Sequence, residues 1–201
     1  MILAAVGNDV VDLTDPAIGR HHENARFVAR VCSEDERLRV STARDLWSLF
    51  AAKEAAYKAL VKLGGSPGFG HRAICVAPDL ASVTWGDRRL ALRVTGDHEH
   101  VHAVAWTEGG QPIARVARAG ASGRDESEGA RAVLRRLVAE AIGCAPGELE
   151  VVRDLRAGAW DGFGPPRIVR AGAPVDADVS LSHDGSFVAA AALLGPALVG
   201  S

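Results

Sequence analysis

The sequence predicts an α+β protein made of two similar α/β halves that pack on each other. The chain has 201 residues, of which 48% are apolar and 24% charged, so it can bury a sizeable core. Each half is expected to end in a hairpin whose last strand is small and apolar, at residues 101–106 and 187–194. This weak internal repeat is the observation that favours two packed halves.

The expected elements follow from the spacing of apolar residues, because short apolar runs predict strands and helical spacing predicts helices. In the first half, over residues 1–116, we expect a strand at 2–6, helices at 23–40 and 42–63, and strands at 73–77, 90–94 and 101–106. Few large apolar residues follow Val116, so we interpret residues 117–127 as a linker. In the second half, over residues 128–201, we expect a helix at 128–142, a strand at 149–152, a loop at 156–178 and a hairpin turning at Asp184-Gly185.

Composition and charge exclude several classes of protein. The formal net charge is −2, from 23 basic and 25 acidic residues, which excludes a strongly basic nucleic-acid binder. No apolar run approaches the roughly 20 residues of a membrane span, and the N-terminus lacks a signal-peptide pattern. The 3 cysteines are too widely spaced for a disulfide framework or a zinc pattern. We therefore expect a cytoplasmic protein with neither a nucleic-acid nor a membrane partner.

The helix expected at 42–63 carries a lysine where an apolar residue belongs. At about 100° per residue, one stripe of this helix contains Leu46, Leu49, Phe50, Tyr57, Leu60 and Val61. Lys53 falls inside the stripe, Glu54 lies at its edge, and Lys58 is one helical turn beyond Glu54. Either Lys53 extends to solvent and Glu54 and Lys58 form an ordinary surface pair, or these charges belong to a site.

Two polar segments are candidates for a site. Residues 7–12, Gly-Asn-Asp-Val-Val-Asp, follow the first expected strand, where carboxylates can hold magnesium together with water or phosphate. The alternative is that Asp9 and Asp12 cap a turn and a helix. Residues 180–183, Ser-Leu-Ser-His, lie at a hairpin corner, where hydroxyls and an imidazole can bind phosphate oxygens. The alternative there is a polar hairpin tip.

Together these motifs resemble the 4′-phosphopantetheinyl transferase superfamily. The family patterns are a G-x-D near a strand end, a K-E-A-x-x-K helix after it, and a serine-histidine motif. Here they stand as Gly7-Asn8-Asp9, as Lys53-Glu54-Ala55-Ala56-Tyr57-Lys58 and as Ser180-Leu181-Ser182-His183. Arg26-Phe27 resembles the R-F pair that often precedes the K-E-A helix. The resemblance extends over nearly the whole chain.

The order of the motifs resembles a two-half, surfactin-synthetase-activating-like member with its halves exchanged. Residues 1–107 are similar to the C-terminal half of such members, and residues 128–194, with an arginine-rich helix, to the N-terminal half. The short holo-acyl-carrier-protein synthases have the present motif order, but they trimerise. The resemblance therefore implies a monomeric pseudodimer with its active site between the halves.

The activity that the resemblance implies is transfer of 4′-phosphopantetheine from coenzyme A to a serine of an acyl or peptidyl carrier protein. The reaction needs Mg²⁺ and releases adenosine 3′,5′-bisphosphate. Carried over to this sequence, the metal ligands are Asp9 and Glu54, and the catalytic residues are Glu54 and Lys53. The coenzyme A contacts carried over are Lys58, Ser182, His183, Arg131 and Arg135.

The sequence departs from the family pattern at several positions. Asn8 replaces an apolar residue, and Val11 stands where two-half members often have a second acid, whereas Asp12 matches the acid of short members. The G-K-P loop of the family appears as Gly-Pro-Pro at residues 164–166, without its lysine. These departures weaken the expected grip on coenzyme A but leave the two metal ligands in place.

Two other functions stay open at this point. A degenerate paralogue would bind carrier domains without catalysis, although the intact Asp9, Lys53, Glu54, Lys58 and His183 argue against it. A phosphate hydrolase using Asp9 and Glu54 would release phosphate without a carrier protein, but it explains neither the K-E-A-x-x-K pattern nor the repeat.

Overall fold

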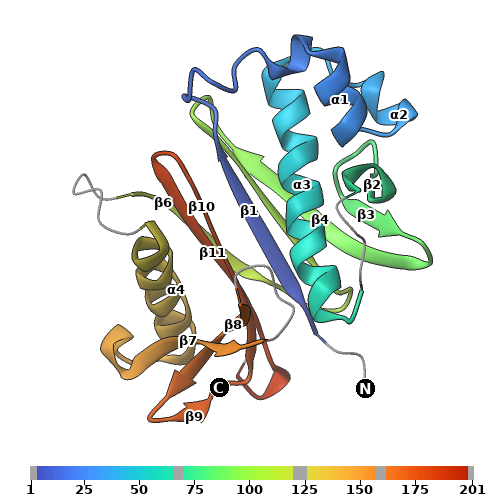
Figure 1. Cartoon of the computed structure of the whole chain (residues 1–201). Helices are drawn as coiled ribbons and strands as arrows, with labels where there is room; N and C mark the ends of the chain where they lie inside the picture. Colours follow the sequence, from blue (N-terminus) through green and yellow to red (C-terminus); the bar gives the residue numbers. More distant parts are fainter. Residues whose placement is uncertain (1–3, 66–69, 120–125, 157–161, 199–201) are drawn as a thin grey trace.

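A computed structural model describes residues 4–65, 70–119, 126–156 and 162–198. It is a mixed α/β protein in which one long helix, α3, packs on a five-stranded antiparallel sheet (Figure 1). A second helix, α4, packs on a three-stranded antiparallel sheet, and a further three-stranded ribbon lies beside it. No helix in these ranges is long and apolar enough to cross a membrane.

The five-stranded sheet has the order β1-β5-β4-β3-β2. Its strands are β1 (Val6–Asp12), β2 (Cys75–Val76), β3 (Ser82–Trp85), β4 (Arg88–Gly96) and β5 (His100–Trp106). Between β1 and β2 the chain forms the helices α1 (Ala25–Val31), α2 (Glu34–Arg37) and α3 (Ala43–Lys62). A short 3₁₀ turn, η2 (His71–Ala73), connects α3 with β2.

The remaining elements form the sheet β10-β11-β6 and the ribbon β7-β8-β9. They are β6 (Ile113–Arg118), α4 (Glu126–Ile142), β7 (Leu149–Leu155), β8 (Phe163–Arg170), β9 (Ala173–Pro174), β10 (Ala177–Asp184) and β11 (Phe187–Leu194). The β10–β11 hairpin turns where the Asp-Gly pair predicts it, with Gly185 at a φ of +50°. Although β6 runs two residues into the segment expected as a linker, it pairs with β11.

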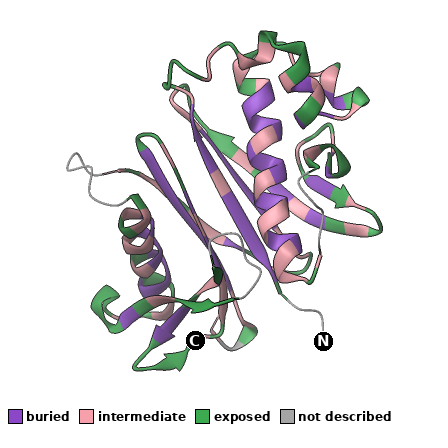
Figure 2. Cartoon of the chain, in the orientation of Figure 1, coloured by how far each residue is buried: buried purple, intermediate pink, exposed green. Residues whose placement is uncertain are grey.

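Small residues bring α3 unusually close to β1. The helix begins at a capping box formed by Thr42 and Asp45. Its sheet-facing side consists of fully buried alanines, which are Ala51, Ala52, Ala55, Ala56 and Ala59 (Figure 2). A Cβ on Gly7 would lie 1.9 Å from the carbonyl oxygen of Ala55. Only glycine fits there, so the glycine of G-x-D allows the helix side chains to reach β1.

Three expectations from the sequence are wrong in detail. The first described strand is Val6–Asp12, because β1 pairs with β5 along that whole length, so G-x-D lies within a strand and not after it; residues 2 and 3 of the strand expected at 2–6 lie outside the described residues. The helix expected at 23–40 is two short helices, because Cys32 is extended and Ser33 caps a new helix with Glu36. The loop expected at 156–178 contains β8 and β9. Pro165 and Pro166 are tolerated because the two-residue β9 pairs only with the far end of β8.

The two sheets meet where β1 lies beside β10, and side chains make the connection. Alternate side chains of β10 accept hydrogen bonds from alternate backbone N–H groups of β1, always 172 residues apart. The pairs are Val6 with Asp178 (2.6 Å), Asn8 with Ser180 (3.0 Å), Val10 with Ser182 (3.1 Å) and Asp12 with Asp184 (2.8 Å). This side-chain ladder satisfies the free edge of the five-stranded sheet and sets the register of β1 against β10.

Candidate active site

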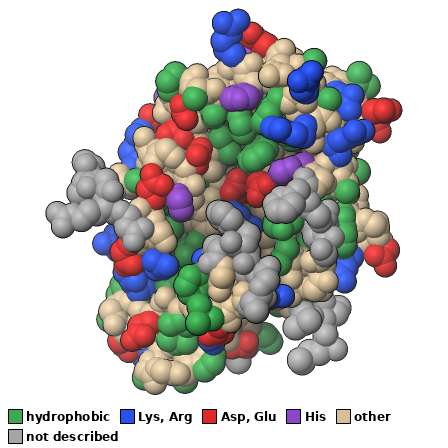
Figure 3. Space-filling model, in the orientation of Figure 1, with side chains coloured by type: hydrophobic (Ala, Val, Ile, Leu, Met, Phe, Trp, Pro, Cys, Tyr) green, Lys and Arg blue, Asp and Glu red, His purple; other side chains and the backbone are tan. Residues whose placement is uncertain are grey.

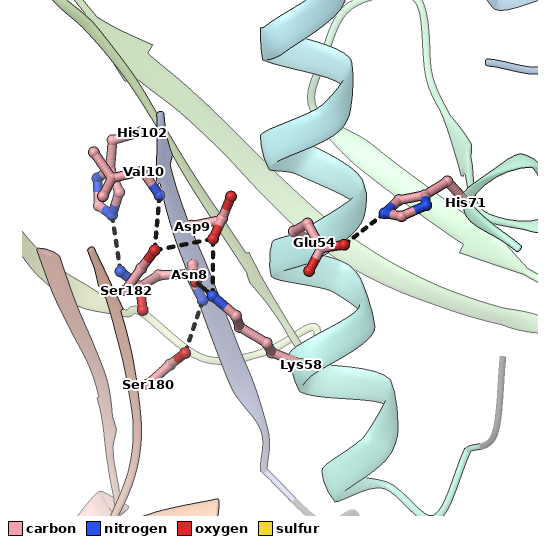
Figure 4. Close-up of polar contacts among 9 residues, drawn as sticks. All are labelled: Asn8, Asp9, Val10, Glu54, Lys58, His71, His102, Ser180 and Ser182. Atoms are coloured by element: carbon pink, nitrogen blue, oxygen red, sulfur yellow. Dashed lines mark hydrogen bonds and ion pairs between the residues drawn. The ribbon is translucent and has the colours of Figure 1, made fainter. Parts of the chain in front are cut away.

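Asp9 lies at the centre of this junction, between α3 and β10 (Figure 4). Its Oδ1 accepts hydrogen bonds from Lys58 Nζ at 2.8 Å and from Ser182 Oγ at 2.9 Å. Its side chain is 13% exposed. Burial raises the pKa of Asp9, and the charge of Glu54 raises it too, although Lys58 and Ser182 oppose the shift. Three motifs that are far apart in sequence therefore meet at one carboxylate.

Lys58 projects from α3 toward the same strand. Its ammonium donates to the carbonyl oxygen of Asn8 at 2.9 Å as well as to Asp9. An ammonium has three donors, so these two bonds leave one N–H for another oxygen. The side chain is 31% exposed, which keeps this donor within reach of a bound molecule.

Glu54 lies one turn before Lys58 on α3. Its Oε1 is 2.5 Å from Nε2 of His71, which lies in η2. Burial pushes the pKa of Glu54 up, but the hydrogen bond and charge of His71, together with Lys58, outweigh burial and hold this pKa below its ordinary value. Glu54 is therefore ionised at neutral pH. Figure 3 shows acidic side chains in a hollow near the centre of this face of the molecule.

The two carboxylates fit the magnesium ion that the resemblance implies. Each uses one oxygen, Oδ1 of Asp9 and Oε1 of Glu54, in the contacts above, and within the described ranges the second oxygen of each accepts no hydrogen bond. Magnesium takes one or two carboxylates and fills its other positions with water and phosphate oxygens. No group of three or more His, Cys, Asp or Glu residues suited to a metal occurs in those ranges, so the protein ligands would number two.

Asp12 does not join this pair of candidate ligands. Its Oδ1 accepts from the backbone and the hydroxyl of Thr14, and its Oδ2 accepts from the backbone N–H of Ser186. Both oxygens therefore brace the chain where β1 ends against the hairpin turn. Asp12 thus caps a turn at Thr14 and the β10–β11 turn, and not the next helix as the alternative had it, because α1 begins later and is capped by Asn24.

The serine-histidine motif divides between two faces of β10. Ser180 and Ser182 point to β1, and His183 points the other way because successive residues of a strand alternate. His183 Nδ1 lies 2.8 Å from Oε2 of Glu126, in the first turn of α4, and its side chain is 47% exposed. The structure thus brings Ser182, but not His183, to Asp9.

Arg131 and Arg135 also lie on α4, beside another glutamate of its first turn. Arg135 is 2.7 Å and Arg131 3.8 Å from carboxylate oxygens of Glu128. Both arginine side chains are about one-third exposed or less. Both arginines, like His183, therefore pair with a glutamate of α4, separate from the contacts of Asp9.

Lys53, which lies in the apolar stripe of α3, is fully buried and does not extend to solvent, and its partner is Glu36 of α2. Its Nζ lies 2.5 Å from Oε2 of Glu36 and 3.0 Å from the carbonyl oxygen of His71. Its ammonium is therefore directed to the side of α3 that faces α2 and η2, and not toward Asp9.

Sequence reasoning missed His71, Lys62 and the ladder residues Asp178 and Asp184. Lys62 donates to the carbonyl oxygens of Val6 and Val179 and to Asp178, so it ties α3 to both sheets. Two signals were present: the four-residue spacing of Glu54, Lys58 and Lys62, and the polar residues at every second position of 178–184. No sequence signal marked His71.

A cavity of about 440 Å³ opens beside the end of α3. The Gly-Pro-Pro segment at 164–166 lines it, together with Lys62, Arg156, Arg167, Asp154 and Asp178. The segment that departs from the family's G-K-P loop thus faces a cavity whose basic side chains come from other positions.

Asn8, which stands where the family pattern has an apolar residue, forms a buried polar pair with His102 of β5. Its Nδ2 lies 3.2 Å from Nε2 of His102, and its Oδ1 has no hydrogen-bond partner in the described ranges. Burial lowers the pKa of His102 to about 4, with smaller contributions from His100, Arg93 and Lys58. The imidazole is therefore neutral at pH 7 and can accept the bond from Asn8.

This buried histidine predicts acid sensitivity of the fold. Because the pKa of His102 is depressed in the folded state, the unfolded chain binds more protons between about pH 6.5 and 4, and stability falls as pH drops through this window. The contribution is a loss of about 2 kcal/mol between pH 7.5 and 5. Urea unfolding at both pH values should show it, and His102→Gln, which keeps an acceptor but cannot titrate, should show a smaller loss. An equal loss in both proteins would contradict the prediction.

Comparison with models of protein families gives a match that includes three residues of the candidate site. The family model for the 4′-phosphopantetheinyl transferase superfamily matches residues 5–117, which is more than half of the chain and includes Asp9, Glu54 and Lys58. A comparison with curated proteins finds no match. The chain belongs to the 4′-phosphopantetheinyl transferase superfamily, whose members are transferases of phosphopantetheine.

Proposed function

We propose that this protein transfers 4′-phosphopantetheine from coenzyme A to a serine of a carrier protein, with Mg²⁺ as its metal. The observation that carries the proposal is the meeting of Asp9, Lys58 and Ser182, with Glu54 one helical turn away. Three separate motifs thereby supply oxygen ligands, a cation and a hydroxyl at one place. A substrate pyrophosphate needs these groups.

The reaction exchanges one phosphorus–oxygen bond for another. The carrier serine oxygen bonds to the phosphorus that carries pantetheine, and the bond from that phosphorus to the bridging oxygen breaks. The bridging oxygen leaves with adenosine 3′,5′-bisphosphate. The serine proton passes to Glu54 or to a water molecule.

The side chains around Asp9 prepare the site for this exchange. A magnesium ion held by Asp9 and Glu54 would offset the negative charge of the pyrophosphate. Lys58 keeps Asp9 oriented and offers its third N–H to a phosphate oxygen, and Ser182 holds Asp9 from the other sheet. Glu54 is ionised, which suits it both to bind the ion and to accept a proton.

The rest of coenzyme A would lie along the junction of the two sheets. His183, Arg131 and Arg135 are partly exposed and are paired only with Glu126 and Glu128 in the described ranges, so a phosphate could compete for them. The cavity at residues 164–166 offers Lys62, Arg156 and Arg167 nearby. In this proposal the two α/β units form a monomeric, cytoplasmic pseudodimer. Lys53 contributes to the site indirectly, through its hydrogen bond to the backbone of His71, which contacts Glu54.

The test is intact-protein mass spectrometry of an apo carrier protein incubated with this protein, coenzyme A and Mg²⁺. We expect a mass gain of one phosphopantetheine, which EDTA abolishes. Glu54→Ala and Asp9→Ala should each lower the rate at least about 100-fold, since a catalytic metal supplies several kcal/mol of transition-state stabilisation. Glu140→Ala, at an exposed glutamate of α4, is the matched control and should leave the rate unchanged.

Other outcomes would identify the competing functions. Coenzyme A binding without any mass gain across fatty-acid, polyketide and peptide-synthetase carriers would indicate a protein that only binds carriers. Phosphate release in the absence of a carrier would indicate a hydrolase. The absence of coenzyme A binding would contradict the proposal altogether.

A further inference from the structure

The candidate metal ligand Glu54 is held by His71, a residue outside the sequence motifs described above. His71 contacts Oε1 of Glu54 through its Nε2. The other oxygen of the same carboxylate, Oε2, accepts no hydrogen bond in the described ranges. We propose that His71 is a positioning residue, which fixes the Glu54 carboxylate so that its second oxygen faces the metal. The inference rests on the proposed function, because that function supplies the metal.

His71 is itself fixed at two points besides Glu54. Its ring stacks on Phe50 of α3, with centroids 5.2 Å apart and an interplanar angle of 23°. Its carbonyl oxygen accepts a hydrogen bond from Lys53 Nζ at 3.0 Å. The imidazole therefore has little freedom to turn away from Glu54, which lies on the same helix as Phe50 and Lys53.

The buried pair of Lys53 and Glu36 anchors this arrangement in the core. Glu36 accepts hydrogen bonds from the backbone N–H groups of Ser33 and Val76 as well as from Lys53. The pair thus joins α2, α3 and β2. Lys53 also donates a hydrogen bond to the backbone carbonyl oxygen of His71. This explains why a charged residue interrupts the apolar stripe of α3.

The two candidate ligands are then prepared in the same way. Lys58 and Ser182 hold one oxygen of Asp9, and His71 holds one oxygen of Glu54. A carboxylate on a helix would otherwise lose rotamer freedom when it binds the ion. Partners of this kind orient metal ligands, and their removal typically lowers metal affinity by about 10- to 100-fold.

Three substitutions separate the hydrogen bond from the packing of the ring. His71→Phe keeps a ring against Phe50 but has no donor, His71→Gln keeps a donor but has no ring, and His71→Ala has neither. His98→Ala, at an exposed histidine outside these contacts, is the matched control. Binding of Mn²⁺, as a probe for Mg²⁺, is measured by electron paramagnetic resonance with coenzyme A present. The Mg²⁺ concentration that gives half-maximal carrier modification is measured in parallel.

We expect His71→Phe and His71→Ala to weaken Mn²⁺ binding by about 10-fold, while His71→Gln and His98→Ala stay close to the wild type. The modification rate of His71→Phe should recover at saturating Mg²⁺, which a damaged fold would not allow. Wild-type Mn²⁺ affinity in His71→Phe, or no Mn²⁺ binding by the wild type, would overturn the inference. If Mn²⁺ binding depends on His71 but no carrier is modified, the inference stands and the proposed function fails.

Discussion

Replacing Lys53 by Met is expected to lower the free energy of unfolding by about 3–5 kcal/mol. The Glu36 carboxylate that Lys53 contacts is only 1% exposed, and the substitution leaves this charge buried without its cation. Met fills a similar volume, so the loss reports the unpaired charge rather than a cavity. Urea unfolding at pH 7 measures the change.

Two further variants make this result specific. Glu36→Gln in the Lys53→Met background removes the buried charge and keeps an oxygen for the N–H of Val76, so it should recover at least about 2 kcal/mol. Arg20→Met removes an exposed ion pair with Glu23 and should cost less than about 1 kcal/mol. If Lys53→Met were as stable as Arg20→Met, the buried pair would not hold this part of the fold together.

Gly7→Ala is expected to lower the rate of carrier modification strongly, although it adds only one methyl group. The new Cβ would overlap the carbonyl oxygen of Ala55, so α3 must move away from β1. Overpacking of this kind costs about 1–3 kcal/mol, and sometimes more. The same movement separates Lys58 from Asp9, and a misplacement of about 1 Å can lower a rate about 100-fold.

The measurement is the rate of carrier modification at saturating Mg²⁺, together with urea unfolding. Gly147→Ala is the matched control, because in the described part of the chain a Cβ built there meets nothing within 4 Å apart from its own local backbone and neighbours. We expect Gly147→Ala to change neither quantity. A Gly7→Ala protein with the wild-type rate would show that the close approach of α3 to β1 is unnecessary for the site.

The local pattern of the chain was sufficient for several features. It predicted α3 almost to the residue, the turn at Asp184-Gly185 and the family, and it placed Lys53 in the apolar stripe without deciding whether the side chain is buried. In each case the relevant interactions join residues close in sequence: one helical turn, one capping box or one hairpin. Such spacings determine which side chains share a face, wherever that face packs.

Contacts between distant segments were decided only by the tertiary structure. The sequence placed Lys53 in the apolar stripe but decided neither its burial nor its partner Glu36, and it could not predict that His71 meets Glu54. The extension of β1 through Asp9 depends on pairing with β5, about 90 residues later in the chain. The alternating polar residues of β10 became a ladder only because β1 has a free edge beside them. Strand pairing and the burial of charge depend on which surfaces meet, and one-dimensional spacing carries no information on that choice.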